Sequence, residues 1–215
     1  MFGHPLVAAG LVLWLPLFEP AVVGSLKAEA LDRIAVSVGQ EVITESQVIL
    51  DLRVAAFLDR KPVDLSGAAK RQSAERLVDQ LLILREAVDS HVTLPSVEAT
   101  AGLVEPYAVE SGYQENLERY GISERDLGAH LLAGLRTLTF TDLRFRPDVQ
   151  VSPDDVRSYY DKLPNSAAAP NPSFEDSREQ IEKLLAEQRV LDALDQWLAM
   201  ARGPANIRYR DKAFE

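Results

Sequence analysis

The sequence predicts a mainly helical (α+β) fold, with about six to seven helices and a small antiparallel sheet. Three observations lead to this fold class. Two short β-branched runs flank Gly39 near the start, stretches with helical spacing of apolar residues fill 44–202, and a short extended run, 205–209, follows Gly203-Pro204. We expect the run at 205–209 to pair with the early hairpin and to close one small sheet.

The composition narrows the classes of function. The chain has 215 residues, 47% of them hydrophobic, a formal net charge of −10, no cysteine and three histidines. The hydrophobic fraction argues against disorder, and the acidic charge argues against binding to nucleic acid. The lack of cysteine excludes disulfides and thiolate metal sites. We find no catalytic, cofactor-binding or metal-ligating motif, and we expect no cofactor and no enzymatic activity.

The first 30 residues read as a signal peptide. An apolar run of 13 residues, Leu6–Phe18, is short for a membrane span, and it precedes Ala28-Glu29-Ala30, a pattern that signal peptidase cleaves. Cleavage would release the mature chain outside the cytoplasm. The alternative is a retained segment that anchors the protein in the membrane.

The first elements follow from turn and cap chemistry. Ile34–Val38 and Glu41–Ile43 should form a hairpin around Gly39, and Thr44 with Gln47 should form a capping box that opens a helix ending before Lys61-Pro62. The residues expected on one face of this helix are Val48, Leu52, Ala55 and Ala56. A longer helix should run from Ser66 to Ser90, with an apolar stripe of Leu77, Leu81, Leu84 and Val88, widened by Val78 and Leu82.

The later helices are also marked by caps and breakers. We expect them near residues 96–107, 113–120, 123–146, 152–163 and 173–202. Two of them have clear apolar stripes, made of Leu127, Leu131, Leu135 and Leu138, and of Ile181, Leu184, Leu191, Leu194 and Leu198. The uncharged, proline-rich segment 164–172 should be a linker.

The order of these elements resembles the chaperone core of the SurA family of periplasmic proteins, which also occurs in the membrane-anchored relative PpiD. The stretches that carry the resemblance are DRIAVSVGQEVITES at 32–46, the helix at 71–88 with its centre LVDQLL, YGISE at 120–124, VQVSPDDVRSYY at 149–160, and 174–197 with the IRY that follows. The resemblance covers nearly the whole mature chain, and it rests on order and spacing because no single motif is decisive.

The chain departs from that family at one place. Parvulin prolyl-isomerase domains usually lie between the Tyr-Tyr helix and the last helix, where this chain has only the linker 164–172. The expected organisation is therefore a signal peptide at 1–30, a helical chaperone region at 31–163, the linker at 164–172, and a helix and strand at 173–215 that complete the same domain.

The resemblance implies an ATP-independent holdase that binds unfolded clients, typically outer-membrane proteins. Two alternatives stay open: a diverged peptidyl-prolyl isomerase, and a non-enzymatic adaptor for one dedicated envelope partner. A separate isomerase or an assembly machine is a further expected partner, whereas nucleic acid and, after cleavage, stable membrane insertion are not expected. The candidate client-binding residues are apolar side chains off the core stripes: Phe57, Leu58, Tyr107, Tyr113, Phe140, Phe145, Tyr159, Tyr160, Trp197 and Met200.

Overall fold

The computed structural model describes residues 32–164 and 172–215. These belong to one compact unit, Asp32–Glu215. The predicted signal peptide and residues 165–171 of the predicted linker lie outside the described residues. Within the described part of the chain, no helix is both long and apolar enough to cross a membrane.

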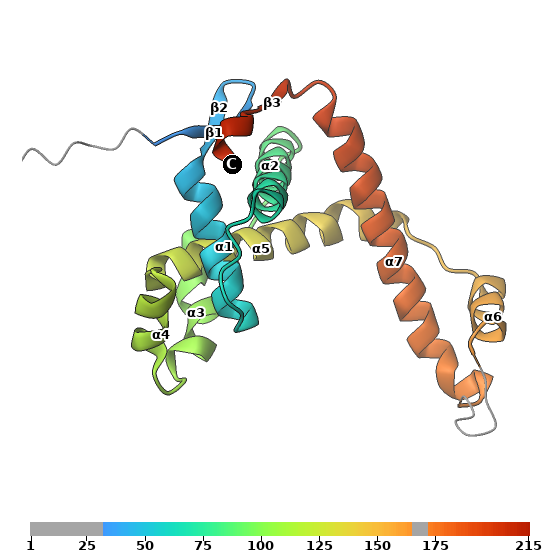
Figure 1. Cartoon of the computed structure of the whole chain (residues 1–215). Helices are drawn as coiled ribbons and strands as arrows, with labels where there is room; N and C mark the ends of the chain where they lie inside the picture. Colours follow the sequence, from blue (N-terminus) through green and yellow to red (C-terminus); the bar gives the residue numbers. More distant parts are fainter. Residues whose placement is uncertain (1–31, 165–171) are drawn as a thin grey trace, which may run out of the picture. The chain divides into compact units, whose positions relative to one another are not determined.

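The predicted fold class is confirmed: the described residues form seven α-helices and a three-stranded antiparallel sheet (Figure 1). The elements are β1 (Ile34–Val38), β2 (Glu41–Thr44), α1 (Glu45–Asp59), α2 (Gly67–Asp89), α3 (Thr100–Ala108), α4 (Tyr113–Tyr120), α5 (Glu124–Phe145), α6 (Pro153–Asp161), α7 (Phe174–Arg202) and β3 (Ile207–Tyr209), with short 3-10 turns at Val97–Ala99, Arg146–Asp148 and Asp211–Ala213.

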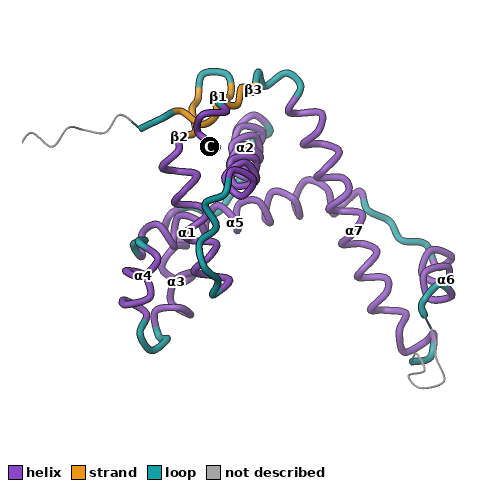
Figure 2. The backbone as a smooth tube through the Cα atoms, in the orientation of Figure 1, coloured by secondary structure: helices purple, strands orange, loops and turns teal. Residues whose placement is uncertain are grey.

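The sheet joins the two ends of the described chain, as the sequence predicts. Its strand order is β2-β1-β3, and Val36 of β1 is opposite Ile43 on one side and Tyr209 on the other. Gly39 turns the hairpin with a φ of +61°, a conformation that glycine adopts without strain. Figure 2 shows the three short strands together in a chain that is otherwise largely helical.

The helix starts are set by side-chain caps. Thr44 and Gln47 form the predicted capping box at α1, and Ser123 with Asp126 does the same at α5. In each case the hydroxyl accepts the N3 amide proton while the N3 side chain accepts that of the cap residue. These local bonds explain why the sequence predicts the helix boundaries so well.

Three apolar clusters form the core. The first lies between the sheet and α2, the second joins α1 and α5 to α3 and α4, and the third joins the C-terminal halves of α2 and α5 to α7. Their most deeply buried large side chains include Val36, Val78, Leu127, Phe140 and Ile83. The core is therefore spread along the long helices, each of which packs against different neighbours over its length.

The predicted apolar stripes are only partly buried. The buried residues of α2 include Ala74, Val78, Leu82 and Ala87, while Leu84 and Val88 of the expected stripe are exposed. The buried face of α2 is shifted from the expected stripe because its first half packs in the cluster with the sheet and its second half in the cluster with α5 and α7. Leu138 of α5 and Leu184 and Leu191 of α7 are exposed for the same kind of reason: these helices change neighbours along their length.

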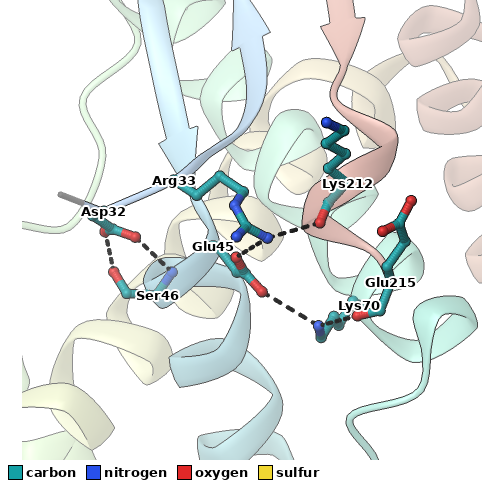
Figure 3. Close-up of polar contacts among 7 residues, drawn as sticks. All are labelled: Asp32, Arg33, Glu45, Ser46, Lys70, Lys212 and Glu215. Atoms are coloured by element: carbon teal, nitrogen blue, oxygen red, sulfur yellow. Dashed lines mark hydrogen bonds and ion pairs between the residues drawn. The ribbon is translucent and has the colours of Figure 1, made fainter. Parts of the chain in front are cut away.

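Polar contacts tie Arg33 to the last described residues. Figure 3 shows them as one set that joins Arg33, Glu45, Lys70, Lys212 and Glu215, with a separate contact between Asp32 and Ser46 beside it. Arg33 donates to the main-chain oxygen of Lys212 at 2.8 Å. Lys70, which is buried, donates to Glu45 Oε1 at 3.3 Å and to the main-chain oxygen of Glu215 at 3.0 Å. These bonds fix the chain after β3 onto the start of α2.

Candidate functional site

An apolar groove lies between β2 and the helices α1, α2 and α5. Its cavity has a volume of about 410 Å³ and opens to solvent. The apolar side chains along it are Val42, Ile43, Leu50, Val54, Leu77, Leu81, Leu84, Ala129 and Ala133. A groove of this size, lined mostly by apolar side chains, suits an apolar chain or ring as its occupant.

The sequence forms this groove by placing leucines beside the core instead of inside it. Leu77, Leu81 and Leu84 recur at i, i+4 and i+7 on α2, so they share one face, and that face borders the cavity. On the opposite wall, α5 contributes Asp126, Ala129, His130 and Ala133, and its apolar side chains there are only alanines. Small side chains on one wall and leucines on the other leave the space unfilled.

A buried carboxylate forms the polar end of the groove. Asp51 of α1 is only 6% exposed. Its Oδ2 accepts from Ser73 Oγ at 2.7 Å and from an Arg76 guanidinium nitrogen at 2.6 Å, and its Oδ1 lies 3.1 Å from His130 Nδ1. Because Ser73 and Arg76 belong to α2 and His130 to α5, one side chain connects three helices.

These partners keep Asp51 ionised. Burial by itself raises the pKa of this carboxyl, but the hydrogen bonds from His130 and Ser73 and the positive charge of Arg76 outweigh burial and hold the pKa below its ordinary value. At neutral pH the group is therefore a fixed negative charge with its acceptor sites filled. It is suited to holding the helices together and poorly suited to donating a proton.

The cluster contains a serine, a histidine and an aspartate, the residue types of a hydrolytic triad. In a triad the serine donates to the histidine and the histidine to the aspartate. Here the Ser73 hydroxyl, which is fully buried, lies within hydrogen-bond distance of Asp51 and of the Val48 carbonyl oxygen, 3.1 Å away. The geometry is that of a structural cluster. Among residues 32–164 and 172–215, no group of three or more histidine and acidic side chains could hold a metal ion.

Most of the ten predicted client-binding residues are not free surface. Tyr113, Phe140 and Phe145 are buried, which contradicts their expected exposure. Phe57 contacts Tyr107 and Tyr113 with ring centroids 6.3 and 6.5 Å apart, in the cluster that joins α1 to α3 and α4. Aromatic side chains bury large areas, so they gather where helices cross.

The remaining predicted residues are divided between packed and exposed positions. Leu58 is half-buried beside Phe57, and Trp197 packs against Phe140 with tilted rings whose centroids are 5.3 Å apart. Tyr159 is half-buried on α6, and the hydroxyl of Tyr160 donates to the Pro172 carbonyl at 2.8 Å. Met200 is 69% exposed. None of the ten lines the groove.

The sequence did not predict the groove residues as a site because the apolar spacing that contains them was interpreted as a core-facing stripe. Leu77, Leu81 and Leu84 were expected to form the inward-facing apolar stripe of their helix, and the sequence offered no motif around His130. One signal was present: Asp51 lies between Val48 and Leu52, in the apolar part of its helix, where an unpaired charge would be costly.

The groove thus offers apolar walls, a charged anchor whose bonds are already filled, and a strand along one side. This arrangement can hold an apolar segment reversibly, and its residues offer no activated nucleophile. Comparison of the chain with protein-family models, curated proteins and solved structures finds no match.

Proposed function

We propose that the protein is an ATP-independent holdase chaperone that binds unfolded polypeptides, above all outer-membrane proteins in transit through the periplasm. The open apolar groove between β2, α1, α2 and α5 is the observation that carries the proposal. The resemblance of the sequence to the SurA-family chaperone core supports the choice of clients and of compartment. The proposal places the described residues in that family's chaperone core.

Binding in this groove would be weak and tolerant of sequence. Apolar burial contributes about 25 cal/mol per Å² and has no directional preference, so many client segments can use the same leucine wall. Asp51, the buried carboxylate at the groove, already accepts hydrogen bonds from Ser73 and Arg76 of the protein itself, so it does not need a bond from the client. A client segment therefore leaves without chemistry and without nucleotide hydrolysis.

A light-scattering assay with an unfolded outer-membrane protein tests the function. We expect the wild-type chain, in molar excess, to suppress aggregation of the client. Leu84→Asp should abolish most of this suppression because it puts a charge on the groove wall at a position already 36% exposed. Leu138→Asp is the matched control, because Leu138 is 64% exposed and does not line the groove. Aggregation that proceeds unchanged with the wild-type chain would refute the proposal.

The proposal includes no catalytic step. A protease-coupled assay with a proline-containing peptide tests this. The isomerisation rate should equal the uncatalysed rate, whose time constant is about tens to hundreds of seconds. A faster rate that scales with protein concentration would favour the diverged isomerase. Capture experiments separate the other alternative: many substoichiometric clients support the holdase, and one stoichiometric partner supports the adaptor.

A further inference from the structure

Within residues 32–164 and 172–215, nothing pairs with the outer edge of β2. In the strand order β2-β1-β3, no strand of the described residues lies beyond β2. An open edge is a template for another strand, and proteins usually cover or interrupt one that is not used. The hydrogen bonds of the sheet show which groups of β2 face this edge.

The side of β1 that faces β3 is fixed by two hydrogen bonds. The amide of Arg210 donates to the carbonyl of Ala35 at 2.9 Å, and the amide of Gly39 donates to the carbonyl of Asn206 at 3.5 Å. Backbone groups of alternate residues in a strand point to opposite sides. Residues 35, 37 and 39 therefore face β3.

The residues between them face β2. Val36 is opposite Ile43 and Val38 is opposite Glu41, so these two pairs form the ladder between β1 and β2. The N–H and C=O of Val42, which lies between Glu41 and Ile43, consequently point away from β1. Val42 as a residue is 49% exposed, so this part of the strand edge is open to solvent.

The free edge is short because a cap ends it. The next outward amide, that of Thr44, donates to Gln47 Oε1 at 2.9 Å in the capping box. Val42 is thus the residue of β2 with both a donor and an acceptor turned outward. A strand bound here would gain few main-chain bonds, which suits transient capture.

The same edge borders the groove. Of the three strands only β2 contributes lining residues, and these are Glu41, Val42 and Ile43. The charged residues of the lining are Glu41, Asp51 and Asp126, joined by His130, and none of the described lining residues is Lys or Arg. Arg85 and Arg76 pair with Glu41 and Asp51, so Asp126 is the acidic side chain of the described lining that has no cationic partner among the described residues.

We propose that an extended client segment binds as a fourth strand on β2, paired with the main chain of Val42, and places alternate apolar side chains in the groove. The segment is rich in β-branched or aromatic residues and carries flanking lysines or arginines that match the acidic lining. Strand addition of this kind takes affinity from main-chain bonds and selectivity from pockets for every second side chain. The inference rests on the proposed function and adds the conformation of the client.

Val42→Pro tests the strand pairing. Proline removes the outward N–H, and it is tolerated on an edge strand because no ladder bond is lost. Val42→Thr is the control, since it keeps the N–H and the β-branched shape. The probe is the acetylated, amidated peptide Lys-Val-Thr-Val-Thr-Val-Lys with a fluorescent label. By fluorescence anisotropy we expect its Kd to rise about tenfold with Val42→Pro and to change little with Val42→Thr. An unchanged Kd for Val42→Pro overturns the proposal.

Amide hydrogen exchange gives a second readout that needs no variant. In the wild-type full chain, saturation with the peptide should slow exchange at the Val42 amide. Exchange that stays as fast as in the free protein overturns strand pairing. Protection of this amide before any peptide is added also overturns it, because a second copy or residues 1–31 of this chain would then occupy the edge.

Leu84→Asp separates failure of this inference from failure of the proposed function. If Leu84→Asp releases the peptide and Val42→Pro does not, the groove binds clients without strand pairing, and only the inference fails. If neither substitution changes peptide binding or the suppression of aggregation, the groove is not the client site and both proposals fail.

Discussion

His130 Nδ1 lies 3.1 Å from Asp51 Oδ1, so a contact between two side chains at the end of the groove links α5 to α1. The other oxygen of the same carboxylate binds Ser73 and Arg76 of α2. The walls of the groove are therefore held by one buried charge. Its loss should loosen the site and the fold together.

Asp51→Asn should lower the free energy of unfolding. The amide keeps the size of the side chain but cannot accept equally well from Ser73, Arg76 and His130. We expect the free energy of unfolding to fall by about 1–3 kcal/mol. The lower part of this range is expected because Arg76 is partly exposed and solvent screens its charge. Urea unfolding measures it, with Glu179→Gln as the control. That exposed carboxylate pairs with Lys183, and its loss should change stability little. Equal losses for the two variants would contradict this role of Asp51.

The ionisation of Asp51 should also affect how stability depends on pH. The pKa of Asp51 is lowered in the folded protein: burial opposes this, but the bonds from His130 and Ser73 and the charge of Arg76 prevail. The stabilisation is therefore complete above the unfolded pKa of about 3.9 and is lost as pH falls through the folded value. Wild-type stability should decline below about pH 4–5, and Asp51→Asn should decline less steeply. Parallel curves for the two proteins would exclude this linkage.

Gly67 should be intolerant of any side chain. A Cβ added there would clash with the main-chain oxygen of Phe214, so the chain after β3 would have to move. Gly67→Ala should therefore cost about 1–3 kcal/mol. Gly134→Ala in α5 is the control, because an added Cβ meets no atom within 4 Å, and it should stabilise by about 0.5–1 kcal/mol. If the thermal unfolding midpoint rises for both variants, the chain at Phe214 can move to accept a side chain at Gly67, and the prediction is wrong.

The sequence predicted what depends on neighbours along the chain. The Gly39 hairpin, the Thr44 and Ser123 caps and the last strand each follow from a few adjacent residues, and all are present. The faces of the long helices were not predictable in this way. Leu84 lies on a groove and Phe140 in the core because α2 and α5 meet partners that are distant in sequence. Periodicity shows that a helix is amphipathic, but it cannot show which neighbours leave a gap.

Removal of residues 205–215 should destabilise the whole unit. This segment supplies β3, which pairs with β1, and Ala213, which is 1% exposed in the cluster between the sheet and α2. It also supplies the main-chain acceptors of Arg33 and Lys70. We expect the thermal unfolding midpoint to fall by about 10 °C or more. An unchanged midpoint in differential scanning calorimetry would mean that the segment does not contribute to the folded core.

Substitutions at Phe140 and Met200 test whether the predicted client-binding residues serve packing or client binding. Phe140 is fully buried against Phe145 and Trp197, so Phe140→Ala should cost about 3–5 kcal/mol of unfolding free energy. Met200→Ala, at a side chain that is 69% exposed, should change stability by less than about 0.5 kcal/mol. Below its lowered unfolding temperature, the Phe140→Ala protein should still suppress client aggregation, because Phe140 does not line the groove. A Phe140→Ala protein that keeps its stability but no longer suppresses aggregation would instead place Phe140 on the client-binding surface.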